Sequence, residues 1–223
     1  MKPCLFYLLI CSVLITSCGK TIFYATVDNE PIGGFPNTNQ KVGTVKFSVH
    51  DSVRIAKITG LPGKWIKLGR SFPESDVVSL QCKVDTMRGD KAYQFSTYLF
   101  LDNQSPTSSI SFEAFNQPMS ELQGFLHIDL LPDNKLRVND DANKTFGSFP
   151  RNQPFILSVS FNTITNNPTA HISLSGAGAS GTFDTPLLNF GPSNYHRFGQ
   201  VRFWMGWPHI GKFNATNILV KYK

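Results

Sequence analysis

From about residue 42 to the C-terminus, apolar and polar residues alternate with a period of two, which predicts a series of short β-strands. The clearest run covers residues 93–101, where Tyr93, Phe95, Thr97, Leu99 and Leu101 share one face. Similar alternation covers residues 45–49, 53–55, 65–68, 78–84, 110–114, 126–130, 136–138, 155–161, 170–174, 201–205 and 218–222. The sequence Pro-Asp-Asn-Lys at 132–135 predicts a hairpin turn, because Pro presets φ and Asn tolerates left-handed geometry.

About a dozen short strands with turn signals between them favour an all-β fold, an antiparallel sandwich or barrel. The alternation implies that one face of each sheet is exposed to solvent. A parallel α/β sheet is covered on both faces and would not show this pattern. Residues 117–124 are the only helix candidate. Residues 18–41 hold turn formers without a sustained period, so we interpret them as a tether that precedes a single domain over residues 42–223.

The N-terminus has the features of an export signal. Lys2 precedes an apolar stretch over residues 5–15, which is shorter than the roughly 20 residues of a spanning helix. Residues 15–18, Ile-Thr-Ser-Cys, resemble the bacterial lipobox. That resemblance implies a lipoprotein signal peptide over residues 1–17, a lipidated Cys18 and a membrane partner. Gly19, in place of Asp, implies the outer membrane by analogy with enterobacterial sorting; the alternative is an ordinary secretory signal and a secreted protein.

Charge and cysteine usage narrow the picture further. Only 16% of residues are charged and the net charge is +6, yet no run of four basic residues and no nucleic-acid motif occurs, so we expect no nucleic-acid partner. Two readings stay open: a mildly basic surface, or weak attraction for anionic glycan or lipid. Cys82 is the only cysteine after residue 18, so no disulfide can form within the predicted domain. Its apolar neighbours at period two predict that Cys82 is a core residue.

Two parts of the chain resemble a known superfamily. Residues 124–140, read as paired strands around the 132–135 turn, precede a strand over 154–161, and residues 201–205 and 217–222 follow later. This order is similar to concanavalin A-like and laminin G-like jelly rolls. The resemblance implies a two-sheet antiparallel sandwich in which the last strand returns beside the first.

Some members of that superfamily degrade polysaccharides. Laminarinase-like enzymes carry Glu-x-Asp-x-x-Glu on one strand, and here Glu113 alone, or Glu74 with Asp76, leaves that triplet incomplete. Alginate-lyase-like members use His and Tyr near an Arg-rich strand. Here His127 and residues 195–197 (Tyr-His-Arg) are the nearest equivalents, without the family's motifs. We therefore assign no catalytic residue.

Calcium is the one cofactor that a local cluster suggests. Asn139, Asp140 and Asp141 are rich in the oxygen ligands that calcium prefers, and laminin G-like domains often bind calcium at loop rims. A plain polar turn is the competing interpretation.

Aromatic residues near the C-terminus suggest a ligand site. If residues 201–205 alternate, Trp204 faces opposite to Phe203 and Met205, and Trp207 and His209 follow in a loop. Trp204, Trp207, Arg202 and His209 form the predicted site, since exposed tryptophan faces stack on sugar rings; core filling is the alternative.

The sequence thus predicts a lipid-anchored envelope protein whose β-sandwich binds a glycan or another surface ligand without catalysis. The alternatives are a polysaccharide-degrading hydrolase or lyase of the same fold, and a structural envelope lipoprotein without a small ligand.

Overall fold

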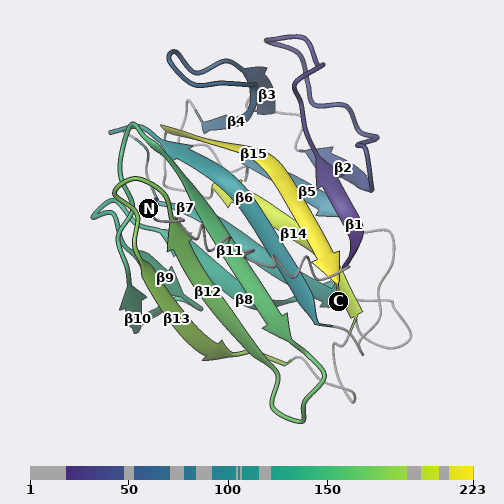
Figure 1. Cartoon of the computed structure of the whole chain (residues 1–223), viewed down its shortest axis with the longest axis vertical. Helices are drawn as coiled ribbons and strands as arrows, with labels where there is room; N and C mark the ends of the chain where they lie inside the picture. Colours follow the sequence, from purple (N-terminus) through teal and green to yellow (C-terminus); the bar gives the residue numbers. More distant parts are fainter. Residues whose placement is uncertain are drawn as a thin grey trace, which may run out of the picture.

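The computed structural model describes residues 19–47, 53–70, 78–83, 92–103, 105, 107–115, 122–189, 197–205 and 211–222. Within these ranges the chain forms fifteen β-strands in two antiparallel sheets that pack face to face (Figure 1). The predicted all-β sandwich is therefore confirmed. No helix in the described part of the chain is long and apolar enough to cross a bilayer.

The eight-stranded sheet has the order β13-β12-β11-β6-β15-β4-β3, with β1 beside β15. Its strands are β1 (Lys20–Ala25), β3 (Val53–Ala56), β4 (Trp65–Arg70), β6 (Tyr93–Leu101), β11 (Pro154–Asn162), β12 (Thr169–Ser175), β13 (Gly181–Pro186) and β15 (Gly211–Tyr222). The seven-stranded sheet has the order β10-β9-β8-β7-β14-β5-β2. Its strands are β2 (Thr44–Phe47), β5 (Val78–Lys83), β7 (Ser108–Phe115), β8 (Leu122–Leu130), β9 (Leu136–Val138), β10 (Asp141–Phe146) and β14 (Arg197–Met205).

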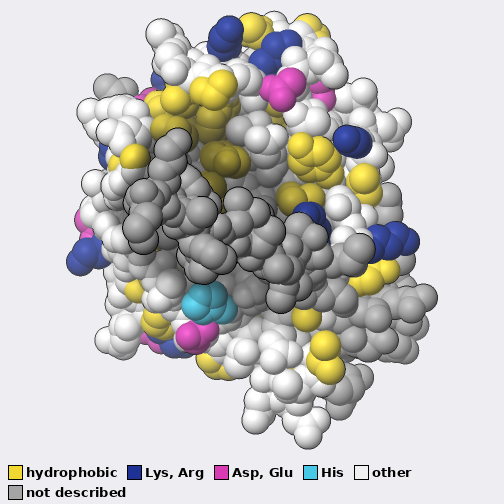
Figure 2. Space-filling view, in the orientation of Figure 1, with side chains coloured by type: hydrophobic (Ala, Val, Ile, Leu, Met, Phe, Trp, Pro, Cys, Tyr) yellow, Lys and Arg dark blue, Asp and Glu magenta, His cyan; other side chains and the backbone are white. Residues whose placement is uncertain are grey.

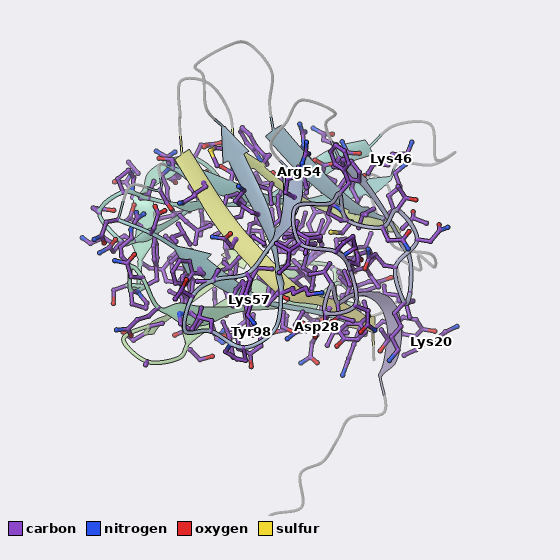
Figure 3. The ribbon with its side chains drawn as sticks, turned by 90° about the horizontal axis from the view of Figure 1, so that it is seen from above. Lys20, Asp28, Lys46, Arg54, Lys57 and Tyr98 are labelled. Carbon is purple, nitrogen blue, oxygen red and sulfur yellow. The ribbon has the colours of Figure 1, made fainter. Side chains whose placement is uncertain are left out.

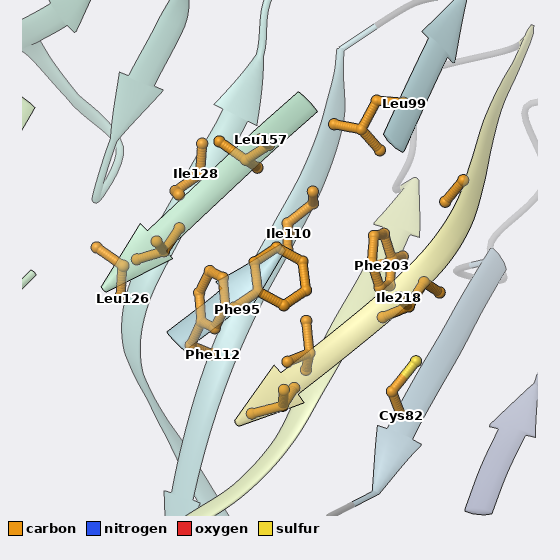
Figure 4. Close-up of a cluster of buried hydrophobic side chains, with 14 of the residues drawn as sticks. Cys82, Phe95, Leu99, Ile110, Phe112, Leu126, Ile128, Leu157, Phe203 and Ile218 are labelled. Atoms are coloured by element: carbon orange, nitrogen blue, oxygen red, sulfur yellow. The ribbon is translucent and has the colours of Figure 1, made fainter. Parts of the chain in front are cut away.

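The core lies between the sheets and is rich in phenylalanine (Figure 4). Phe112 of β7 sits among other rings, with centroids 5.0 Å from those of Phe95 and Phe161. Full burial of such a ring contributes about 2–3 kcal/mol. Cys82 of β5 is completely buried, as predicted, and burial raises the pKa of its thiol far above the usual value.

The sandwich begins earlier than the predicted boundary at residue 42. β1 pairs antiparallel with the C-terminal half of β15, and its side chains Ile22 and Phe23 are buried. The chain then stays close to the domain, because a Cβ at Gly43 would lie 2.6 Å from the Phe23 ring. Residues 20–27 are thus part of the fold, and interpreting all of 18–41 as a tether is wrong for this segment.

Two local predictions have different outcomes. The turn at 132–135 forms as expected: the Leu131 amide donates to the Lys135 carbonyl at 2.9 Å, and Asn134 has a φ of 67°. The helix candidate at 117–124 is wrong over its last three residues, which begin strand β8. Its first five residues lie outside the described ranges.

Candidate functional site

Polar side chains line the outer face of the seven-stranded sheet, opposite the core. Backbone pairing places His127 of β8, Ser111 of β7 and Arg202 of β14 in one row across the strands. The row continues through Gln81 of β5 to Lys46 of β2. Alternate residues of a strand point to opposite faces, so these five side chains all point away from the core. With them we group, as the polar face, Lys83, Ser109, Glu113, Asp129, Arg137, Gln200 and Trp204.

Trp204 lies on this polar face and not in the core, so it does not fill the core, and ligand binding by it stays a prediction. Its indole Nε1 donates a hydrogen bond to Ser111 Oγ at 3.0 Å. The His127 ring lies 5.5 Å from the indole, and the Arg202 guanidinium carbon 5.8 Å from it. A half-buried aromatic ring is therefore held by a polar anchor, a second ring and a cation.

Asp129 is the buried centre of an ionic cluster beside that ring. Its carboxylate accepts hydrogen bonds from Ser109 Oγ at 2.6 Å and from Arg137 Nη2 and Nε at 2.6 and 3.0 Å. Burial alone would raise the pKa of Asp129, but the contacts with His127, Ser109 and Arg137 outweigh it and hold that pKa well below its usual value. Asp129 therefore stays ionised at neutral pH and fixes its neighbours.

His127 lies between two carboxylates. Nδ1 is 3.2 Å from Asp140 Oδ2, and Nε2 is 3.0 Å from Asp129 Oδ1, although not in hydrogen-bonding geometry. Burial lowers the pKa of His127, but the two carboxylates raise it by a larger amount. The net effect is a pKa above the usual value. Both ring nitrogens of His127 therefore face acidic groups.

A hollow of about 200 Å³ opens next to this cluster. Ser111, Glu113 and His127 line it from the sheet, and Leu188, from the segment between β13 and β14, lines it from the side. Glu113 is hydrogen-bonded by Gln200, and its Oε1 lies 3.8 Å from Arg202 Nη1. The hollow is smaller than the roughly 300–1,000 Å³ of ligand pockets, so it would accept a single ring or chain end.

The predicted calcium trio is divided among different partners. Asn139 Oδ1 accepts a hydrogen bond from the His127 amide at 2.9 Å. Asp141 accepts one from the Asn143 amide at 3.0 Å and pairs with Lys144. Of the trio, only Asp140 lies in a group of possible metal ligands, with His127 and Asp129, whose candidate atoms are within 4.8 Å of one another. Arg137 and the imidazole already balance those carboxylates, and calcium binding stays a prediction.

Several predicted residues lie outside the described ranges: Cys18, Trp207, His209, Glu74, Asp76 and residues 195–196. Arg202 and Trp204 are the predicted ligand residues that the structure places, and it places them together. Sequence reasoning missed Ser111, Gln200 and Arg137. Alternation predicts that Arg137 points to solvent, because it stands between the core residues Leu136 and Val138. That it meets Asp129 depends on the register of β8 and β9, which the sequence does not reveal.

A second hollow, of about 320 Å³, lies on the outer face of the eight-stranded sheet. It is lined by Ser96, Ser158, Ser160 and Ser173, whose hydroxyls make no hydrogen bond within the described part of the chain. Tyr98 is 41% exposed on the same face. Figure 2 shows this face, with a histidine beside an acidic side chain in the lower half and hydrophobic side chains gathered in the upper part.

Neither a protein-family model nor a curated protein sequence matches this chain. Solved structures do. A protein of unknown function from Shewanella oneidensis MR-1 has a TM-score of 0.57 and 12% identity, covering 100% of this chain and 97% of its own. Lectin UEA-II, complexed with galactose, has a TM-score of 0.52 and 9% identity, covering 86% and 97%. The catalytic domain of a glycoside hydrolase family 131 protein from Coprinopsis cinerea has a TM-score of 0.52 and 12% identity, covering 91% and 94%.

At these identities the similarity defines the fold. The chain folds as a jelly-roll β-sandwich similar to that of the lectin. The expected two-sheet, concanavalin A-like architecture is therefore confirmed. In this chain the last strand returns beside the first, β15 beside β1, as expected.

Proposed function

We propose that this protein is a non-enzymatic glycan-binding module of the cell envelope, and that the polar face of the seven-stranded sheet is its binding site. The observation that carries the proposal is the placement of Trp204. Its ring is half-buried on the outer sheet face, and it contacts Ser111 and His127, which line the hollow of about 200 Å³. Aromatic faces surrounded by hydrogen-bonding groups suit sugar rings, which have an apolar face and a rim of hydroxyls.

The ionic arrangement favours binding over catalysis at this face. General acid–base work needs a group that can exchange a proton with the substrate. His127 has a carboxylate at each ring nitrogen, and Asp129 is held ionised by Arg137. Glu113 is engaged by Gln200 and lies near Arg202. Such mutually bonded groups are rigid hydrogen-bonding partners.

The experiment is retention of the purified domain on a panel of insoluble polysaccharides. We expect the wild type to be depleted from solution by at least one member and Trp204→Ala to remain in the supernatant. Tyr98→Ala is the matched control, since it removes an exposed aromatic ring from the opposite sheet. Release of reducing ends or unsaturated uronates from a polysaccharide would contradict the non-enzymatic proposal and favour the polysaccharide-degrading enzyme. Loss of retention in Tyr98→Ala alone would move the site to the serine-lined hollow.

The envelope location rests on the sequence of residues 1–18. We infer that Cys18 is lipidated and that the protein is attached to a membrane, with the outer membrane as its destination. The test is incorporation of radiolabelled palmitate in a bacterial host that processes lipoproteins, with Cys18→Ser as control. Equal labelling of both proteins, or of neither, would contradict the anchor, and recovery of the wild type in the medium would favour the secreted alternative.

A further inference from the structure

The positive charge of this protein is concentrated in its N-terminal third. Residues 1–83 contain ten Lys and Arg against five Asp and Glu, whereas residues 84–223 contain eleven against ten. The excess of the first segment therefore accounts for five of the six net positive charges. Part of this charge reaches the polar face, because β2 and β5 form one end of the seven-stranded sheet.

Lys46 of β2 and Lys83 of β5 are neighbours at that end. Thr44 pairs with Lys83 and Lys46 pairs with Gln81, so the two lysines stand diagonally on adjacent strands. Burial first, and the nearby Lys46 charge second, lower the pKa of Lys83. Among the described residues neither lysine has an acidic partner. Two adjacent ammonium groups with no acidic partner in the described part of the chain favour an anionic partner from outside it.

The same face offers further cationic groups in a line. The row from His127 through Ser111, Arg202 and Gln81 to Lys46 crosses five adjacent strands, about 19 Å at roughly 4.8 Å a strand. The Arg202 side chain is 33% exposed, and its Nη1 lies 3.8 Å from Glu113 Oε1. A ligand that stacks on Trp204 and extends across the strands would therefore meet Arg202 first and the two lysines beyond it.

We propose that the glycan bound at the polar face is an acidic polysaccharide, whose chain runs across the strands from the hollow lined by Ser111 and His127 to Lys46 and Lys83. This inference rests on the proposed function and adds the ligand's charge and direction. Figure 3 shows the arrangement from above, with Lys46 on the side of the seven-stranded sheet and Tyr98 and Lys57 on the opposite side. The second hollow, lined by four serines together with Lys221 and His171, lies on the opposite face and outside this path.

The test uses one polymer backbone in two charge states. Polygalacturonate carries a carboxylate on every ring, and its methyl ester carries none. We expect affinity electrophoresis to show retardation of the wild type by polygalacturonate, at least roughly tenfold stronger than by the ester. Retardation should weaken steeply between about 50 and 500 mM NaCl, because salt screens the several ion pairs that hold the polymer.

Variants separate the site from general basicity. The double variant Lys46→Gln/Lys83→Gln should lose roughly three- to thirtyfold in affinity for polygalacturonate, the range for two partly exposed ion pairs. Lys57→Gln is the control, since it removes an exposed positive charge from the other side of the sandwich. Trp204→Ala should abolish retardation.

Three outcomes would overturn the inference. Equal retardation by the ester would remove the charge requirement and leave the proposed function standing. Equal losses of affinity for polygalacturonate in Lys57→Gln and in the double variant would mean that binding depends on the protein's net charge and not on the two lysines. Binding to phosphatidylglycerol vesicles, with no retardation by polygalacturonate, would make the lysines a membrane contact. The proposed function itself fails only if no polysaccharide, acidic or neutral, is bound through Trp204.

Discussion

The rings of His127 and Trp204 lie 5.5 Å apart although their strands, β8 and β14, are not neighbours. Strand β7 runs between them, and strands two positions apart are separated by roughly 9.6 Å. The rings can approach each other because β7 presents small side chains here: Ser111 pairs with His127, and Ser109 pairs with Trp204. The serines thus leave space for a two-ring surface and anchor it through Ser111 Oγ.

Enlarging Ser111 should therefore destroy the site without unfolding the domain. Ser111→Val removes the acceptor of the Trp204 indole and fills the gap between the rings. We expect loss of polysaccharide retention, altered tryptophan emission and a change in unfolding free energy of about 1 kcal/mol or less, since the position is half-exposed. Ser96→Val on the other sheet is the control. Full retention by Ser111→Val would show that the two rings do not form the binding surface.

The ion pairs of His127 should make stability depend on pH. Because the folded-state pKa of His127 is raised, its contribution is fully present below its unfolded value of about 6.5 and is lost as the pH rises through the folded value. Asp129 has a lowered pKa, so its contribution is present above about pH 4 and is lost only at lower pH. Melting temperatures of wild type and His127→Gln should differ most between about pH 5 and 6.5 and converge at higher pH. A constant difference up to pH 9 would contradict this assignment.

Arg137 is expected to be important for folding because it neutralises a carboxylate that is almost completely buried. Its partner Asp129 has a side chain that is 3% exposed. Arg137→Met should lower the unfolding free energy by about 3 kcal/mol in urea titrations, the lower end for a broken buried pair. Lys144→Met removes a cation from an exposed pair with Asp141 and should change stability by about 0.5 kcal/mol or less. Combining Arg137→Met with Asp129→Leu should restore much of the loss; a double variant as unstable as the single one would point to packing instead.

Strand β1 gives a direct test of where the domain begins. A protein that starts at Gly19 should fold, whereas one that starts at Asp28 lacks Ile22, Phe23, Ala25 and Val27, all of which are buried. Removal of β1 would also leave one edge of β15 unpaired between Ile218 and Tyr222. We expect the shorter protein to aggregate or to melt at a temperature at least about 10 °C lower. Similar melting temperatures for both proteins would restore the boundary at residue 42.

Strands with strict alternation were predictable, and irregular ones were not. In β6 every second residue is buried, so the sequence alternates between apolar and polar residues and predicts the strand. In β1 a register shift between Thr21 and Phe23 places the consecutive residues Ile22 and Phe23 both in the interior. A bulge of this kind removes the period of two on which the prediction depends.

The other strands that pattern reading missed lie at sheet edges. β10 and β13 end their respective sheets and have few buried residues. Few of their side chains are buried, so no sustained apolar face marks these strands in the sequence. The candidate site shows the same limit: alternation assigned Trp204 and His127 to a wet face, but their proximity depends on register and on the small residues between them.

The position of β1 also determines how far the domain could reach. Only Gly19 separates Cys18 from the first residue of the strand at Lys20, a span of roughly 7 Å even when fully extended. An acyl chain on Cys18 would therefore hold the sandwich directly against the lipid headgroups, with little freedom to rotate. A protein attached in this way samples only molecules within one domain's thickness of its own membrane, so its ligand would have to belong to that surface or be brought to it.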